Sequence, residues 1–156
     1  MTALEVGAQA PDFELRDQHG QRVRLSALAG SKAVVLVFFP SAFSPVCSSE
    51  LSTLREAAPE LARAGVELLT VSCDPMFTLR AFSDRERIEY RMLTDFWPHG
   101  EVSKAYDVFD GDFGCSKRST FVIDQDGEVR WLVHNAMPDA RSVDDYLGAL
   151  EFLRSR

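Results

Sequence analysis

The longest continuous apolar stretch of the chain covers residues 33–39 and is rich in β-branched and aromatic side chains. This composition predicts a strand that is buried on both faces of a sheet. Apolar residues then recur every three or four positions over 47–61, which predicts a helix that Gly65 is placed to end. A second apolar run covers 66–72. Because the two strands of such a strand-helix-strand unit run parallel, the pattern predicts an α/β protein.

Pro59 lies inside the predicted helix, where its ring leaves the backbone without an N–H donor. We therefore expect a kink or a break about one turn before it.

Shorter patterns complete the fold prediction. Alternating residues at 12–15 and 22–25 flank a turn and predict an N-terminal hairpin. The chain downstream predicts a helix after Asp74-Pro75, a strand around 90–93, a helix around 100–106, antiparallel strands at 120–123 and 129–133, and an amphipathic helix from Ser142 to Leu153. This order predicts a thioredoxin-like α/β fold in one domain over residues 1–156, with a central mixed β-sheet flanked by helices and an N-terminal β-hairpin extension.

Charge and hydropathy narrow the possible functions. The formal net charge is −7, which argues against a nucleic-acid partner because phosphate binding needs clustered Lys and Arg. No apolar run approaches the roughly 20 residues that span a bilayer. Residues 1–9 have neither the basic nor the apolar region of a secretion signal. We therefore expect a cytoplasmic protein with no membrane partner.

The cysteines suggest a reactive thiol. The chain has three, Cys47, Cys73 and Cys115, which form no CxxC pair, and only three histidines could join them as soft metal ligands. A zinc site is therefore not expected. An odd number of cysteines without a secretion signal favours reduced thiols.

Cys47 has the best position for a reactive thiol. It follows the buried strand and a short loop, and Pro45 suits the first turn of the predicted helix. Ser44 becomes a candidate N-cap, or a hydroxyl donor to the sulfur or its substrate. The positive end of a helix favours the thiolate, which is the nucleophilic form of cysteine. The alternative is that Cys47 is only a small buried apolar residue, but its place at the carboxyl end of a parallel strand favours function.

These residues resemble a known family. The pattern Pro40-x-x-x-Ser44-x-x-Cys47 matches the peroxiredoxin signature Pro-x-x-x-Thr/Ser-x-x-Cys at every defining position. Segments 7–13, 95–100 and 118–124 are similar to the one-cysteine peroxiredoxins called alkyl hydroperoxide reductase E, known from mycobacteria and other actinobacteria. The resemblance covers nearly the whole chain and weakens after position 133.

The resemblance implies roles for four residues, and the position of Glu50 in the helix leaves two interpretations for a fifth. Cys47 would be the peroxidatic cysteine, Pro40 would shield its pocket, and Ser44 would hydrogen-bond the sulfur and the peroxide. Arg118 corresponds to the family's second-strand arginine, whose forked donors can stabilise the thiolate and the departing oxygen. Without the resemblance, Arg118 would be interpreted as an exposed arginine at a strand end. Glu50 either orients Arg118 or is an ordinary favourable acid in the first helical turn.

The implied activity is that of an antioxidant thiol-dependent peroxidase that needs no cofactor. Its substrate would be hydrogen peroxide, an organic hydroperoxide or peroxynitrite, and Cys47 would become a sulfenic acid. An external thiol would recycle it, either mycothiol with mycoredoxin, or thioredoxin. The family also suggests a homodimer or larger homo-oligomer.

The other cysteines leave an alternative open. Cys115 lies in a polar, glycine-containing segment and could act as the resolving cysteine of an atypical two-cysteine peroxiredoxin. Cys73 ends an apolar run and is expected to be a packed core thiol. The same fold also permits a thiol-disulfide oxidoreductase, which the lack of a CxxC pair argues against, or a non-enzymatic binding module. Trp97 and Trp131 are expected to be core or interface aromatics.

Overall fold

The computed structural model of the chain describes residues 4–28, 30–137 and 148. One sheet contains β1 (Glu14–Arg16), β2 (Arg22–Arg24), β3 (Ala33–Phe38), β4 (Val66–Ser72), β5 (Arg91–Thr94), β8 (Ser119–Ile123) and β9 (Val129–His134). A separate ribbon pairs β6 (Phe109–Asp110) with β7 (Cys115–Ser116). The helices are α1 (Leu25–Leu28), α2 (Pro45–Arg63), α3 (Met76–Glu86) and α4 (Glu101–Ala105).

The order of strands across the sheet is β2-β1-β5-β4-β3-β8-β9. Strand β3 is buried along its whole length, pairs in parallel with β4 and antiparallel with β8, and so confirms the predicted central strand of a mixed sheet. The predicted N-terminal hairpin is also confirmed. It joins the sheet because β1 pairs with β5, where Arg16 lies opposite Thr94.

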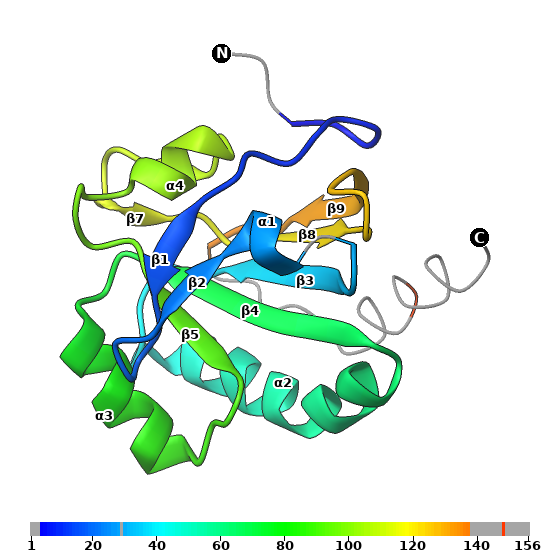
Figure 1. Cartoon of the computed structure of the whole chain (residues 1–156). Helices are drawn as coiled ribbons and strands as arrows, with labels where there is room; N and C mark the ends of the chain where they lie inside the picture. Colours follow the sequence, from blue (N-terminus) through cyan, green and yellow to red (C-terminus); the bar gives the residue numbers. More distant parts are fainter. Residues whose placement is uncertain (1–3, 29, 138–147, 149–156) are drawn as a thin grey trace.

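Helices cover both faces of the sheet (Figure 1). Helices α2 and α3 lie on one face, and α1 and α4 lie on the other. The alternation of side chains along β3 divides the core accordingly, because Val35 and Val37 pack on the α2 face while Val34, Leu36 and Phe38 pack on the opposite face.

Helix α2 starts and ends as its sequence predicts. Ser44 occupies the N-cap position and its side chain accepts a hydrogen bond from the Cys47 amide. The helix ends at Arg63, shortly before Gly65, whose φ of +77° suits a residue without a Cβ. The helix continues through Pro59, so the predicted break is wrong, and the alternative of a kink stays a prediction. Proline removes one hydrogen bond, whereas packing of the apolar face of α2 on the sheet supports the whole helix.

The predicted C-terminal helix lies, apart from Gly148, outside the described residues. Trp97 is 82% exposed, so it is not a core residue, whereas Trp131 is partly buried against the α2-side core. Within the described part of the chain, no helix is long and apolar enough to cross a membrane.

Candidate active site

Cys47 lies in the first turn of α2, directly after the loop that leaves the carboxyl end of β3. Its side chain faces the sheet and is completely buried. The loop makes a sharp turn at Phe43, which has a φ of +71°, and Pro45 opens the helix. The local sequence therefore places a cysteine at the positive end of a helix that is 19 residues long.

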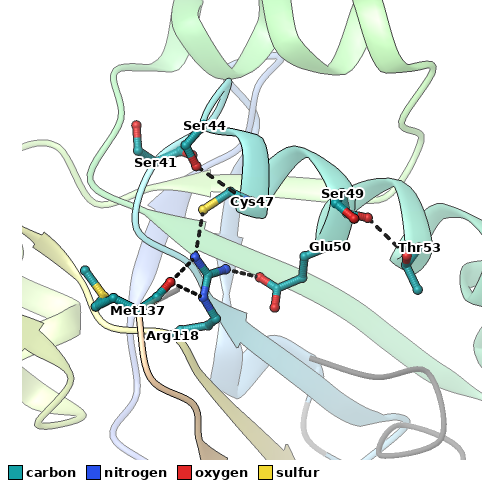
Figure 2. Close-up of polar contacts among 8 residues, drawn as sticks. All are labelled: Ser41, Ser44, Cys47, Ser49, Glu50, Thr53, Arg118 and Met137. Atoms are coloured by element: carbon teal, nitrogen blue, oxygen red, sulfur yellow. Dashed lines mark hydrogen bonds and ion pairs between the residues drawn. The ribbon is translucent and has the colours of Figure 1, made fainter. Parts of the chain in front are cut away.

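Arg118 reaches this thiol from the start of β8, the antiparallel neighbour of β3 in the sheet. It immediately precedes β8, whose first residue Ser119 lies opposite Phe38 at the end of β3. The Nη2 atom of Arg118 donates a hydrogen bond to Cys47 Sγ at 3.4 Å (Figure 2). Antiparallel pairing thus brings together two residues that are 71 positions apart in the sequence.

The guanidinium of Arg118 has partners on every nitrogen. Nη1 contacts Glu50 Oε1 at 2.5 Å, and the Met137 carbonyl oxygen accepts from Nε at 3.1 Å and from Nη2 at 2.8 Å. Arg118 and Glu50 are only 2% and 1% exposed, so this is a buried ion pair. Burial alone would lower the pKa of Arg118, but the hydrogen bond to Cys47 and the charge of Glu50 raise it. The group therefore stays cationic and fixed in orientation.

Ser44 and Pro40 occupy the loop before Cys47. The Ser44 hydroxyl oxygen accepts from the Cys47 amide at 3.4 Å, and the hydroxyl donates to the Ser41 carbonyl at 3.1 Å. The proton of Ser44 is thus directed to the loop backbone in this structure. Pro40 is half-buried and lines a hollow next to the site. The structure therefore brings all five residues of the predicted site into one region.

This hollow has a volume of about 430 Å³ and is lined partly by the two other cysteines. Cys115 begins β7 opposite Asp110, so it lies on a short strand rather than in the predicted loop. Burial, followed by the charge of Asp110, raises the pKa of the Cys115 thiol to about 11. Cys73 is buried as predicted, and burial raises its pKa as well. Both side chains are therefore thiols rather than thiolates at neutral pH.

A chain of hydroxyl groups connects the Cys73 thiol to a buried carboxylate. Its Sγ atom lies 3.7 Å from Ser116 Oγ, which lies 2.7 Å from Ser103 Oγ. Ser103 donates to the buried carboxylate of Asp95 at 2.9 Å. Each hydroxyl in such a chain donates to one neighbour and accepts from the other. Because Ser103 donates to Asp95, it accepts from Ser116, and Ser116 in turn accepts from the Cys73 S–H.

Two contributors to the site were missed by the sequence analysis. Met137 acts through its backbone carbonyl, which no sequence pattern distinguishes. Asp74 accepts a hydrogen bond from the Ala42 amide in the loop before Cys47. A signal for Asp74 did exist, because an acidic residue at the carboxyl end of a buried parallel strand faces the same edge as the end of β3. Within residues 4–28, 30–137 and 148, no cluster of His, Cys, Asp or Glu could hold a metal ion.

The chain is similar to known proteins over most of its length. Residues 6–132 match the family model described as AhpC/TSA family. The chain is 44% identical to alkyl hydroperoxide reductase E of Mycobacterium tuberculosis over 128 residues, which cover 82% of this chain and 84% of that protein.

Solved structures give the same result. The crystal structure of peroxidoxin BcpB from Mycobacterium tuberculosis aligns with a TM-score of 0.84 and 33% identity, covering 97% of both chains. The reduced 2-Cys peroxiredoxin of Plasmodium vivax aligns with a TM-score of 0.86 and 31% identity, covering 94% of this chain and 80% of that chain. These neighbours confirm the predicted thioredoxin-like fold. Because both the family model and these relatives span most of its length, the chain belongs to the AhpC/TSA family and is a peroxiredoxin, a thiol-dependent peroxidase.

Proposed function

We propose that Cys47 is the peroxidatic cysteine and that Arg118 activates it. The observation that carries this proposal is the 3.4 Å hydrogen bond from Arg118 Nη2 to Cys47 Sγ in the first turn of α2. The fixed cation and the helix N-terminus both favour negative charge on the sulfur. Glu50 orients the guanidinium through the buried ion pair. Pro40 shields the pocket of Cys47 and lines the hollow beside it.

In the proposed reaction the Cys47 thiolate attacks one oxygen of a hydroperoxide in line with the O–O bond. A sulfur–oxygen bond forms as the O–O bond breaks, and the departing oxygen takes up a proton to leave as water or alcohol. Cys47 becomes a sulfenic acid. Arg118 donates to the oxygen atoms as charge develops on them, and Ser44 donates to the peroxide once its hydroxyl turns from Ser41.

Reduction of the sulfenic acid needs two thiols. The first condenses with Cys47 to a mixed disulfide and releases water, and the second regenerates the Cys47 thiol by exchange. Peroxiredoxins use thiol reductants, and we assign this role here to an external thiol, either mycothiol with mycoredoxin, or thioredoxin. The pKa of about 11 at Cys115 supports this choice, because little thiolate is available there at neutral pH.

The second candidate is resolution within the chain by Cys115. It is favoured by one observation, that Cys115 and Pro40 line the same hollow. Condensation of Cys115 with the Cys47 sulfenic acid would release water and leave a disulfide between them. After a single turnover without external thiol, the first mechanism leaves a sulfenic acid on Cys47, and the second leaves a disulfide between Cys47 and Cys115.

The substrate would enter through the hollow beside Pro40. Its walls include the apolar side chains of Phe113 and Met137, which suit an organic hydroperoxide as well as hydrogen peroxide or peroxynitrite. The need for reduced thiols on both the enzyme and its reductant supports a cytoplasmic location.

We also propose that the protein self-associates, because peroxiredoxins often form oligomers. Phe77, Phe96 and Trp97 are exposed aromatic residues that line another hollow of about 450 Å³ with Pro75. We assign this face to a homodimer contact, because aromatic side chains are enriched where protein surfaces meet. Trp97→Arg should lower the molar mass measured by light scattering; an unchanged mass would exclude this face.

The deciding experiment treats the reduced protein with one equivalent of hydroperoxide and maps the products by mass spectrometry. We expect a sulfenic acid on Cys47 in the wild-type protein and none in Cys47→Ser, which should no longer consume peroxide. Cys73→Ser is the matched control and should behave as wild type. Peroxide consumption that persists in Cys47→Ser contradicts the proposal, and a disulfide between Cys47 and Cys115 selects the second mechanism.

A further inference from the structure

Asp74 ties the loop before Cys47 to a neighbouring strand. Strands β3 and β4 are parallel neighbours, with Phe38 opposite Val71, so the segments that follow them leave the same edge of the sheet. Asp74 follows β4, and its Oδ2 atom accepts hydrogen bonds from the Ala42 amide at 2.9 Å and from Ser72 Oγ at 2.7 Å. One carboxylate oxygen therefore connects the two segments.

The Asp74 carboxylate does not serve the helix that follows it. An aspartate just before a helix commonly caps it. Here the N-cap of α3 is Pro75, and no side chain makes a cap hydrogen bond there. The Asp74 backbone is held instead by Thr94 in β5, whose hydroxyl donates to the Asp74 carbonyl at 2.5 Å. The residue is fixed from β4 and β5, and its side chain is turned to the loop.

The loop needs such support because of its backbone conformation. Phe43 has a φ of +71°, a region that residues other than glycine rarely adopt. Its ring packs edge-on against Phe82, with centroids 5.2 Å apart, and Arg85 lies 5.5 Å from the ring centroid. Ala42 is held by Asp74 on the other side of the turn. These two contacts hold consecutive residues of the turn just before Ser44 and α2.

We propose that Asp74 is a positioning residue for the reaction of Cys47 with peroxide. It acts through the Ala42 amide, which sets the path of the loop and hence the placement of Ser44 and Cys47 relative to Arg118. The acceptor oxygen provides this effect, rather than the negative charge. The inference rests on the proposed role of Cys47.

Three substitutions separate the acceptor from the charge. Asp74→Asn keeps an acceptor oxygen with two lone pairs at the same distance from the backbone and loses the charge. Asp74→Glu keeps the charge and moves the acceptor by one methylene, and Asp74→Ala removes both. Asp84→Ala is the matched control, because Asp84 is an exposed residue of α3 whose ion pair is with Arg80.

Two rates of Cys47 are measured in each variant by quenched reaction and peptide mass spectrometry. The first is sulfenic acid formation with hydrogen peroxide, which needs correct geometry. We expect it to fall about tenfold or more in Asp74→Glu and Asp74→Ala and to stay within about threefold in Asp74→Asn, as misplacement of reacting groups costs rate steeply. The second is alkylation by a bulky maleimide, which needs an accessible Cys47 thiolate but no alignment with a peroxide, and it should become faster in the Glu and Ala variants as the loop opens.

The outcomes distinguish this inference from the proposed role of Cys47. If Asp74→Glu reacts with peroxide as fast as wild type, or if Asp74→Asn loses as much rate as Asp74→Glu, the inference is wrong although Cys47 remains essential. Peroxide reduction by Cys47→Ser in the same assay would instead overturn the proposed role. The Asn and Glu variants still decide the matter if Asp74→Ala does not fold.

Discussion

The buried ion pair between Arg118 and Glu50 allows the effects of Arg118 on stability and on reactivity to be separated. Arg118→Met removes the guanidinium and leaves the Glu50 carboxylate, which is only 1% exposed, without that partner. Removing one member of a buried ion pair usually costs about 3–5 kcal/mol of unfolding free energy. Glu50→Gln in the same chain removes the remaining charge and should recover more than half of this loss.

The reactivity of Cys47 should not recover with the stability. The lost contact is a charge-assisted hydrogen bond from Arg118 to the Cys47 sulfur, and bonds of this kind contribute about 1.5–3 kcal/mol. With 1.36 kcal/mol for each factor of ten, the rate of sulfenic acid formation should fall about 10- to 150-fold. The same fall is expected in Arg118→Met and in the double variant, since neither can donate to the sulfur.

Urea unfolding at pH 7 gives the stability of the wild type, both single variants and the double variant, and rapid quench with mass spectrometry gives their rates. Arg130→Met is the control, because Arg130 pairs with Asp124 at 3.7 Å and is far more exposed than Arg118. It should change the reaction rate by less than about twofold, because its ion pair lies at the opposite end of β8 from Arg118. A double variant that regains the wild-type rate would refute the proposed contact between guanidinium and sulfur. A loss below about 1 kcal/mol in Arg118→Met would refute the buried ion pair.

Three further predictions concern the thiols and the helix start. Cys115 has a pKa raised to about 11, so its alkylation by iodoacetamide should increase about tenfold per pH unit from pH 7 to 10; a plateau below pH 9 in peptide mass spectra would contradict this. Cys73→Ala should lower the unfolding free energy by about 1 kcal/mol through lost burial and leave the peroxide rate within about twofold. A tenfold slower reaction would mean that Cys73 takes part in the chemistry. Ser44→Ala should lower the unfolding free energy by about 1 kcal/mol, and with it the melting temperature, because the Cys47 amide loses its hydrogen-bond acceptor. Ser44→Thr should restore the lost stability. Equal melting temperatures for the Ala variant and the wild type would exclude a capping role.

The sequence was sufficient where structure depends on residues close together in the chain. The apolar run that became β3 and the periodicity of α2 are local signals, and they placed Cys47 in the first helical turn. Pro59 shows the limit of a local rule. Its effect on the backbone is real, but the packing of α2 on the sheet outweighs one missing hydrogen bond.

Contacts between distant segments could be inferred only by resemblance or not at all. Arg118 was assigned to the site through the family pattern, and antiparallel pairing of β8 with β3 is what brings it to Cys47. The orientation of Glu50 was left open by the sequence, and the structure places it in an ion pair with Arg118. The Met137 carbonyl carries no signal, because every residue has the same group.

The sequence by itself therefore determined which side chains are available and which of them begin or end an element, since periodicity and capping act over a few residues. Only the tertiary structure decided that the loop before Cys47 is tied to the end of β4 through Asp74 and that Arg118 is held by both Glu50 and Met137. The physical reason is that strand pairing sets the distances between segments far apart in the chain. Hydrogen bonds between such segments therefore depend on how the strands pair in the sheet.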